Sequence, residues 1–424
     1  MPKADSASQD VAATKDVAAA NPRRAADAGE VFLTFLRLGV TSFGGPIAHL
    51  GYFRDEFVAR RHWLDEESYA QIVALCQFLP GPASSQVGIV IGYERAGALG
   101  SLAAWCGFTL PSAIALVAFA YGLRAIPNAA SSSWVHGLLV AAVAVVALAV
   151  SSMAASLAPD RPRRTLAVAV AVGALLAPAN GFSQLALIAF GALYGWWFLS
   201  PARRGILPTA PAPTRQLGGG DPRIAIASAI VFLALIIGLP IAEGFIRGGP
   251  FIAFAKFFEV GGLVFGGGHV VLPLLQAQVV PSGWISSTDF LAGYGAAQAV
   301  PGPLFTFAAY LGAAMHHGPV HGVAGAALCL IAIFLPSFLL LAAILPFWDR
   351  ARSNVGAAAV LLGINAAVVG LLLAALYNPV WTSAIHSTID VAIVLVAFLA
   401  LSVWRAPPWS VVLGSALVTG LLQR

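Results

Sequence analysis

Charged residues are scarce in this 424-residue sequence. They make up 10% of the chain, whereas 59% of it is hydrophobic and the mean hydropathy is +0.85. A soluble domain averages about 25% charged residues, so these figures exclude an ordinary soluble globular protein. Lysine is nearly absent, and arginine therefore carries almost all of the positive charge.

Cysteine is also rare, and no enzyme motif is present. Cys76, Cys106 and Cys329 lie inside apolar stretches without paired spacing, so we expect small buried side chains and neither disulfides nor a metal site. HExxH, GxSxG and Walker A motifs are missing, as is a basic patch interleaved with aromatic residues. We therefore expect no enzyme, no cofactor and no nucleic-acid partner, in spite of a pI near 9.3.

Long apolar runs fill most of the chain. From Val31 onward they follow one another with short polar or Pro/Gly-rich breaks, and the alternation typical of a membrane barrel is absent. Because a bilayer requires roughly 20 apolar residues per helix, the pattern predicts an all-α integral membrane protein that contacts the lipid bilayer. The segments run over residues 31–53, 70–93, 96–123, 135–158, 164–178, 182–199, 223–241, 250–280, 290–315, 321–348, 355–377, 386–404 and 409–423.

Composition divides the chain into four regions. Residues 1–30 are rich in Ala, Asp and Ser without an apolar core, so we expect a disordered tail and not a signal peptide. Residues 200–222 are rich in Pro and Gly and predict a linker. A first repeat, 31–199, precedes the linker, and a second repeat, 223–424, follows it.

The two halves carry the same motifs in the same order. The Gly-rich motif recurs at an offset of 222 residues and the PGP triplet at 221, which indicates a duplicated half. The first copy contains SFGGP (42–46), QFLPGP (77–82) and FTLPS (108–112), and the second contains VFGGGH (264–269), QAVPGP (298–303) and IFLPS (333–337).

Counting segments predicts how the repeats face the membrane. If every segment spans, seven crossings separate the two copies, and an odd number inverts the second; inverted repeats are common in secondary transporters. Full crossing would put Arg54, Arg60 and Arg61 outside, against the rule that cytoplasmic loops are Arg-rich. If the first two segments of each repeat are re-entrant, these residues and Arg95 become cytoplasmic like the N-terminus, and the Arg-free loop 280–289 lies outside.

The PGP triplets are the strongest candidates for a binding site. Prolines interrupt a helix, and a new helix that begins after them presents free amides that attract anions. A simple kink is the alternative, and the Gly-rich motifs serve either helix packing or ligand contact. The candidates are Arg37, Ser42, Gly44, Gly45, Gln77, Pro80, Gly81, Pro82, Ser84 and Ser85 in the first half, and Gly266, Gly267, Gly268, Gln298, Pro301, Gly302, Pro303 and Thr306 in the second.

Ionisable residues inside apolar segments form a second set of candidates. Arg37 and Glu259 occupy equivalent positions in the two repeats. Either they pair with each other, or Arg37 attracts an anion while Glu259 carries a coupling proton. Lys256 lies close to Glu259 in sequence. His49 and His269 follow the Gly-rich motifs and can titrate near neutral pH, although a lone histidine is more often a packing residue.

With SFGGP, QFLPGP and FTLPS in one half and LVFGGGHVVLPLL, QAVPGP and IFLPS in the other, the sequence resembles the chromate ion transporter family from Glu30 to about Tyr377. The resemblance implies a bacterial inner-membrane protein that exports chromate and confers resistance to it. It assigns no role to the charged positions. We therefore expect a secondary transporter of chromate.

Other readings of the sequence stay open. Transport of sulfate or another oxyanion, or exchange of chromate for sulfate, is the nearest alternative, and a homodimer is left open. An integral-membrane enzyme, which lacks an evident catalytic group, and a structural membrane subunit are the alternatives from other classes.

Overall fold

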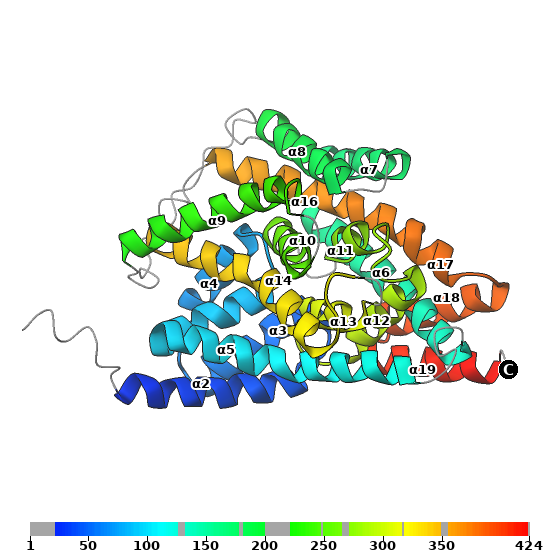
Figure 1. Ribbon diagram of the computed structural model, residues 1–424, viewed down its shortest axis with the longest axis horizontal. Helices are drawn as coiled ribbons and strands as arrows, with labels where there is room; N and C mark the ends of the chain where they lie inside the picture. Colours follow the sequence, from blue (N-terminus) through cyan, green and yellow to red (C-terminus); the bar gives the residue numbers. More distant parts are fainter. Residues whose placement is uncertain are drawn as a thin grey trace, which may run out of the picture.

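The fold is entirely helical in the part of the chain that the computed structural model describes (Figure 1). The description covers residues 22–125, 132–177, 181–199, 221–246, 249–264, 271–315, 318–348 and 355–422. Five helices in these ranges are long and apolar enough to cross a membrane, which confirms the predicted all-α membrane protein. They are Ala83–Ala125, Ser133–Leu157, Pro222–Glu243, Gly322–Phe347 and Ala358–Ala384.

The first half begins with helices that fold back on themselves. α5 turns sharply at Ala96 and Gly97, where Gly97 has φ +66°. Gly92 packs directly against Gly100 there, and the Ser101 hydroxyl donates to the carbonyl of Ile89 at 3.0 Å. Residues twelve apart in a straight helix lie about 18 Å apart, so α5 is an antiparallel pair. The elements are α2 (Pro22–Thr41), α3 (Gly45–Arg54), the π-helical η1 (Asp55–Arg60), α4 (Glu66–Phe78) and α5 (Ala83–Ala125).

An ionic network joins the open ends of these hairpins. The Glu30 carboxylate, near the start of α2, accepts from Arg61 at 2.7 Å and from Arg95 at 3.1 Å. The guanidinium groups of Arg61 and Arg95 each lie 5.2 Å from the Trp63 ring. Residues that flank the apolar segments 31–53 and 70–93 are thus joined to one another, and the re-entrant interpretation stays a prediction.

Fully buried phenylalanines fill the space between these hairpins. The Phe35 ring stacks on Phe57 at 5.0 Å and meets Phe53 edge-on at 5.5 Å, while Phe53 lies 5.1 Å from Phe108 of α5. Such pairs contribute about 0.5–1.5 kcal/mol each beyond the burial of their area. The cluster holds α2, α3 and the long arm of α5 in one rigid unit.

From α10 onward, the second half repeats this sequence of elements. The Tyr310 hydroxyl donates to the Asp289 carbonyl at 2.8 Å, so the helices on either side of the second PGP triplet run antiparallel. Gly312 packs directly against Gly325, as Gly92 does against Gly100. The elements are α9 (Pro222–Glu243), α10 (Pro250–Leu263), α11 (Val271–Val279), α12 (Ser287–Ala299), the 3-10 turn η5 (Leu304–Thr306), α13 (Phe307–Ala314) and α14 (Gly322–Ile344).

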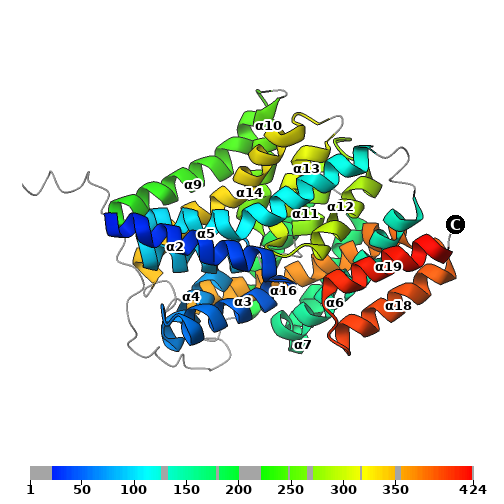
Figure 2. The ribbon, with the colours of Figure 1, turned by 90° about the horizontal axis from the view of Figure 1, so that it is seen from below.

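The remaining helices exchange partners between the halves. In Figure 1, α7 and α8 of the first half lie beside α16 of the second, and Figure 2 shows α18 and α19 beside α6. Glycines allow close approach, since Gly195 faces Gly363 and Gly137 faces Ala416. These elements are α6 (Ser133–Leu157), α7 (Arg161–Leu176), α8 (Gly181–Phe198), η6 (Leu345–Phe347), α16 (Val355–Ala375), η7 (Leu376–Trp381), α17 (Thr382–Ala384), α18 (Thr388–Ser402) and α19 (Pro408–Leu422).

At the element boundaries one sequence expectation changes and another is met. The predicted disordered tail is shorter than 1–30, because α2 begins at Pro22; residues 1–21, like most of the linker, lie outside the described ranges. The segments 31–53, 70–93, 250–280 and 290–315 are each broken into two helices, at the points where the Gly-rich motifs and PGP triplets stand.

Candidate functional site

The two PGP loops adopt the same backbone conformation. Gly81 and Gly302 have φ +121° and +100°, values that glycine adopts without strain. The residue before each triplet, Leu79 or Val300, is extended, and a helix starts after the second proline in both copies. Proline accounts for both features, because it lacks an amide proton and restricts the residue before it.

Each PGP loop binds the opposite half of the chain. The Gly81 amide donates to the Val264 carbonyl, at the end of α10, at 2.6 Å. The Gly302 amide donates to the Ser42 carbonyl, at the end of α2, at 3.0 Å. Ser42 and Val264 are equivalent positions of the repeats, so the contacts are reciprocal, as in a self-complementary two-fold interface. The two loops and the ends of α2 and α10 together make up the candidate site.

The serines of the two LPS motifs close this site, and sequence reasoning did not select them. A Cβ on Gly81 would lie 2.7 Å from the Ser337 hydroxyl, and one on Gly302 would lie 2.8 Å from the Ser112 hydroxyl. Gln86, on the first turn of α5, donates to the Pro80 carbonyl at 2.6 Å and to Ser337 at 3.3 Å. The repetition of FTLPS and IFLPS was the available signal for both serines.

His49 is a fully buried connector between helices. Its Nε2 lies 3.2 Å from the Ser42 carbonyl and its Nδ1 lies 3.3 Å from the Ser84 hydroxyl. The Nε2-protonated tautomer satisfies both contacts, because Nε2 then donates to the carbonyl and Nδ1 accepts from the hydroxyl. The ring also meets Phe108 edge-on at 5.2 Å. These contacts favour the packing role over the coupling role for His49.

Several buried polar atoms of the site have no partner in the described part of the chain. They include hydrogen-bond donors from both repeats, among them the hydroxyl of Thr109 in the FTLPS motif. An unsatisfied buried polar group costs about 1–3 kcal/mol, so an accumulation at one place suits a bound polar ligand. Thr306 differs, because its hydroxyl donates to the Pro303 carbonyl at 2.7 Å. The unpartnered atoms are Ser42 Oγ, Ser85 Oγ, Gln86 Oε1, Thr109 Oγ1 and Gln298 Nε2.

The intramembrane charges do not form the expected pair. Among the described residues Arg37 makes no ion pair, and its side chain is exposed on α2. Lys256 instead pairs with Glu243 of α9 at 2.8 Å, and half-buried Glu259 accepts from Gln278 at 3.5 Å. The proposed Arg37–Glu259 pair is therefore wrong, because each residue faces its own half.

Other predicted site residues do not belong to this set of unpartnered polar atoms or lie outside the described residues. Gln77 is exposed at the end of α4, although its equivalent Gln298 is half-buried. Gly44 and Gly45 adopt φ +99° and +75° and make the turn from α2 to α3. Pro80, Pro82, Pro301 and Pro303 form the two loops themselves. Gly266, Gly267, Gly268 and His269 lie outside the described residues.

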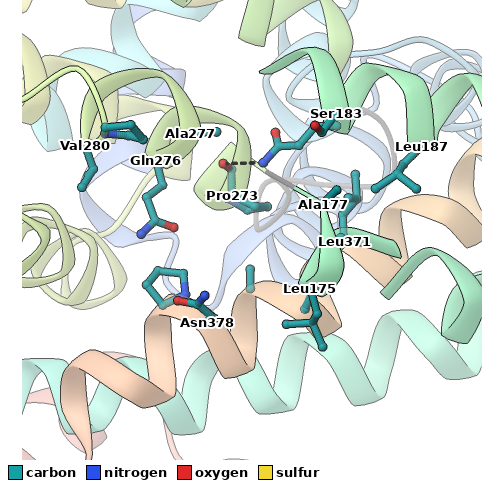
Figure 3. Close-up of a pocket in the computed structure, with 16 residues that line it drawn as sticks. Leu175, Ala177, Ser183, Leu187, Pro273, Gln276, Ala277, Val280, Leu371 and Asn378 are labelled. Carbon is teal, nitrogen blue, oxygen red and sulfur yellow. Dashed lines mark hydrogen bonds between the residues drawn. The ribbon is translucent and has the colours of Figure 1, made fainter. Parts of the chain in front are cut away.

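A separate cavity of about 160 Å³ opens between α7, α8, α11, α16 and η7 (Figure 3). Ser183, Gln276 and Asn378 supply polar groups to it, and Gln184 donates to the Pro273 carbonyl at 3.1 Å beside it. All of its lining residues are uncharged. Sequence reasoning did not predict this cavity, whose lining comes from distant segments.

Fold and site together define a class of protein. Broken helices that meet inside a helical membrane bundle, with free amides and hydroxyls at the breaks, are typical of membrane transporters. The chain belongs to the chromate transporter family, whose sequence profile matches residues 29–196 and 251–420. It is accordingly a multi-pass membrane protein of a transporter family. α9 lies between the two matched blocks.

Individual relatives agree with the family assignment. A chromate transport protein of Pseudomonas aeruginosa is 27% identical over 351 residues, which cover 81% of this chain and 79% of the relative. A chromate transport protein of Cupriavidus metallidurans is 24% identical over 382 residues, covering 88% and 86%. The uncharacterized transporter YwrB of Bacillus subtilis is 32% identical over 120 residues, covering 28% and 59%. No solved structure matches the chain.

Proposed function

We propose that this protein is a secondary transporter that exports chromate across the bacterial inner membrane and thereby confers chromate resistance. Membership of the chromate transporter family supports this substrate, as do the names of the two long relatives. The observation that carries the proposal is the pair of PGP loops, each bonded to the opposite half and surrounded by buried polar atoms without partners.

Chromate is a tetrahedral dianion, and the chemistry of the site suits such a ligand. The hydroxyls of Ser42, Ser85 and Thr109 and the amide of Gln298 are all able to donate hydrogen bonds. The first turn of α5 adds free backbone amides and the positive end of the helix dipole. Arg37, which forms no ion pair within the described ranges, attracts the anion toward the site.

Two hydrogen bonds support an inverted relation between the repeats. The long arm of α5, residues 98–125, measures about 40 Å at 1.5 Å per residue. Arg95, in the turn before this arm, bonds to Glu30, whereas Arg124, at its far end, donates to the carbonyl of Met315 at 3.1 Å. Met315 ends α13, at the turn of the second half that is equivalent to the turn at Ala96 and Gly97 in the first half. The two equivalent turns therefore lie at opposite ends of the long arm of α5.

The distribution of arginines supports an orientation of the protein in the membrane. Arg54, Arg60, Arg61 and Arg95 gather on the face where α2 begins, and the excess of Arg on cytoplasmic loops supports a cytoplasmic N-terminus. Because the cell interior is negative, expelling a dianion is downhill by about 4.6 kcal/mol per 100 mV, twice the value for one charge. Export then requires no nucleotide hydrolysis. Glu259 remains the candidate for a coupling proton.

Transport by everted membrane vesicles tests the function. Vesicles that contain the protein are expected to accumulate labelled chromate, and vesicles without it are not. Sulfate in tenfold excess distinguishes the alternatives: weak competition supports a chromate exporter. Accumulation of sulfate without accumulation of chromate would replace this proposal with a sulfate transporter.

A further inference from the structure

Two histidines and an aspartate meet where α6 and α18 begin. His136 lies on the first turn of α6, Asp390 lies on the first turn of α18, and His386 precedes α18. The Nε2 of His136 lies 2.9 Å from the Oδ1 of Asp390. The rings of His136 and His386 stack with their centroids 5.4 Å apart and their planes at 29°. Three potential ligand groups thus come from two helices that are distant in sequence.

The Asp390 carboxylate is held in one orientation by the backbone. Its Oδ2 accepts from the amides of His386 at 3.0 Å and of Ser387 at 2.9 Å, and the residue is fully buried. Capping of α18 needs only this oxygen and the hydroxyl of Ser387. The other oxygen, Oδ1, therefore faces the histidines. Outer hydrogen bonds of this kind fix a carboxylate that binds a metal ion.

The ligand atoms lie close enough to converge on one tetrahedral metal ion. Zinc binds histidine nitrogen and carboxylate oxygen at about 2.0–2.2 Å, so neighbouring ligand atoms in a tetrahedral site lie about 3.3 Å apart. One ligand atom from each of the three side chains falls within 4.8 Å of the others. Binding requires the ligand atoms to move closer together. His136 is about one-fifth exposed and His386 is exposed, so the His386 ring in particular has room to move.

We propose that His136, His386 and Asp390 bind a divalent transition-metal ion of the zinc class. Imidazole nitrogens with one carboxylate favour such ions over Mg²⁺ and Ca²⁺, which prefer oxygen ligands. The exposed side of His386 leaves a fourth position for water. The bound ion fastens the beginning of α6 to that of α18, one of the contacts by which the halves exchange partners.

Metal binding to the purified full-length protein in detergent tests this site. Isothermal titration with Zn²⁺ is expected to show one saturable site per chain, and Co²⁺ is expected to give the visible absorption bands of a tetrahedral ion. Zn²⁺ also raises the thermal unfolding midpoint, because an ion bound only to the folded state stabilises it. Chromate need not be present, so failure here leaves the transport proposal untouched.

Substitutions then assign the site to these residues. His386→Ala and His386→Gln are expected to weaken Zn²⁺ binding at least about tenfold and to abolish the Co²⁺ bands, since even loss of an outer partner costs that much. His386 is exposed, so both variants should elute like the wild type. The matched control is His321→Ala, another exposed histidine, which should bind as before. Absence of saturable binding, or loss in the His321 variant with none in the His386 variants, would overturn the proposal.

Discussion

Two adjacent serines of the candidate site have different environments. The Ser84 hydroxyl contacts His49, whereas the Ser85 hydroxyl is buried without a partner in the described structure. Sequence alone ranked them equally, because both follow the same PGP triplet. Their difference depends on which side of α5 faces α3, and helix packing decides that.

Ser85→Ala is therefore expected to weaken chromate transport without reducing the amount of protein in the membrane. A hydrogen bond to a charged ligand contributes about 1.5–3 kcal/mol, so the KM for chromate should rise about tenfold or more. Ser84→Ala should instead lower the thermal unfolding midpoint. Ser151→Ala, at an exposed hydroxyl bonded to its own helix, is the control. Initial rates in everted vesicles provide the measurement, and an unchanged KM for Ser85→Ala would contradict the assignment.

The glycine of each PGP triplet is predicted to tolerate no side chain. Gly81→Ala and Gly302→Ala force a left-handed residue and a clash with the serine opposite, at a cost of about 1–3 kcal/mol. Both variants should show a lower unfolding midpoint and lower transport. Gly122→Ala, in a helix with open space around it, should be neutral or stabilising. Equal stability of all three variants would argue against the reciprocal packing of the loops.

Glu56 is expected to make stability depend on pH at the end of the molecule where Arg60 and Arg61 lie. Burial raises the pKa of Glu56, but the hydrogen bond from Arg61 and the charge of Arg60 outweigh it, and the pKa is lowered overall. The depressed pKa means that the stabilisation is present above the ordinary glutamate value of about 4.3 and is lost as the pH falls through the lower folded value. Thermal unfolding between pH 3 and 7 should therefore show a steeper acid loss for the wild type than for Glu56→Gln. Parallel curves would exclude this role.

At the scale of elements, the sequence predicted the helix breaks that contain proline, for a local chemical reason. Each PGP triplet joins two residues without an amide donor to a glycine with positive φ, so the break is encoded locally. Single prolines are not sufficient, since Pro111, Pro240 and Pro336 lie inside continuous helices. The reversal of α5 at Ala96 and Gly97 falls at the predicted break between segments 70–93 and 96–123, although no proline marks it. It depends on Gly92 and Gly100, which allow two helices to touch along their backbones. The Arg37–Glu259 pairing was wrong because equivalence in sequence says nothing about which neighbour a side chain faces.

The glycine contacts of the two hairpins should be equally sensitive to substitution. Gly92→Val and Gly312→Val insert a branched side chain where each helix touches its partner, so both should prevent correct folding. Gly238→Val, on an open face of α9, is the control. Size-exclusion profiles of the detergent-extracted variants measure the effect. A monodisperse peak for either hairpin variant would show that the helices need not be in contact.

At the scale of the whole molecule, the repeated motifs predicted a duplication but not the exchange between its copies. Each PGP loop bonds to the other half, and α6 and α16 pack against the last helices of the opposite copy. Such partners are more than 150 residues apart in places, so they follow from the final packing and not from local propensity. The domain limits at 199 and 223 stay a prediction, since the halves share their contacts.

The central claim is that two oppositely oriented halves meet at the paired PGP loops, and cysteine accessibility tests it most directly. Ala59 and Thr288 are exposed beside equivalent hairpins of the first and second halves. In a background with the three native cysteines replaced by alanine, Ala59→Cys should react with an impermeant maleimide only in everted vesicles. Thr288→Cys should react only in intact cells. Labelling of both positions from the same side of the membrane would contradict the account.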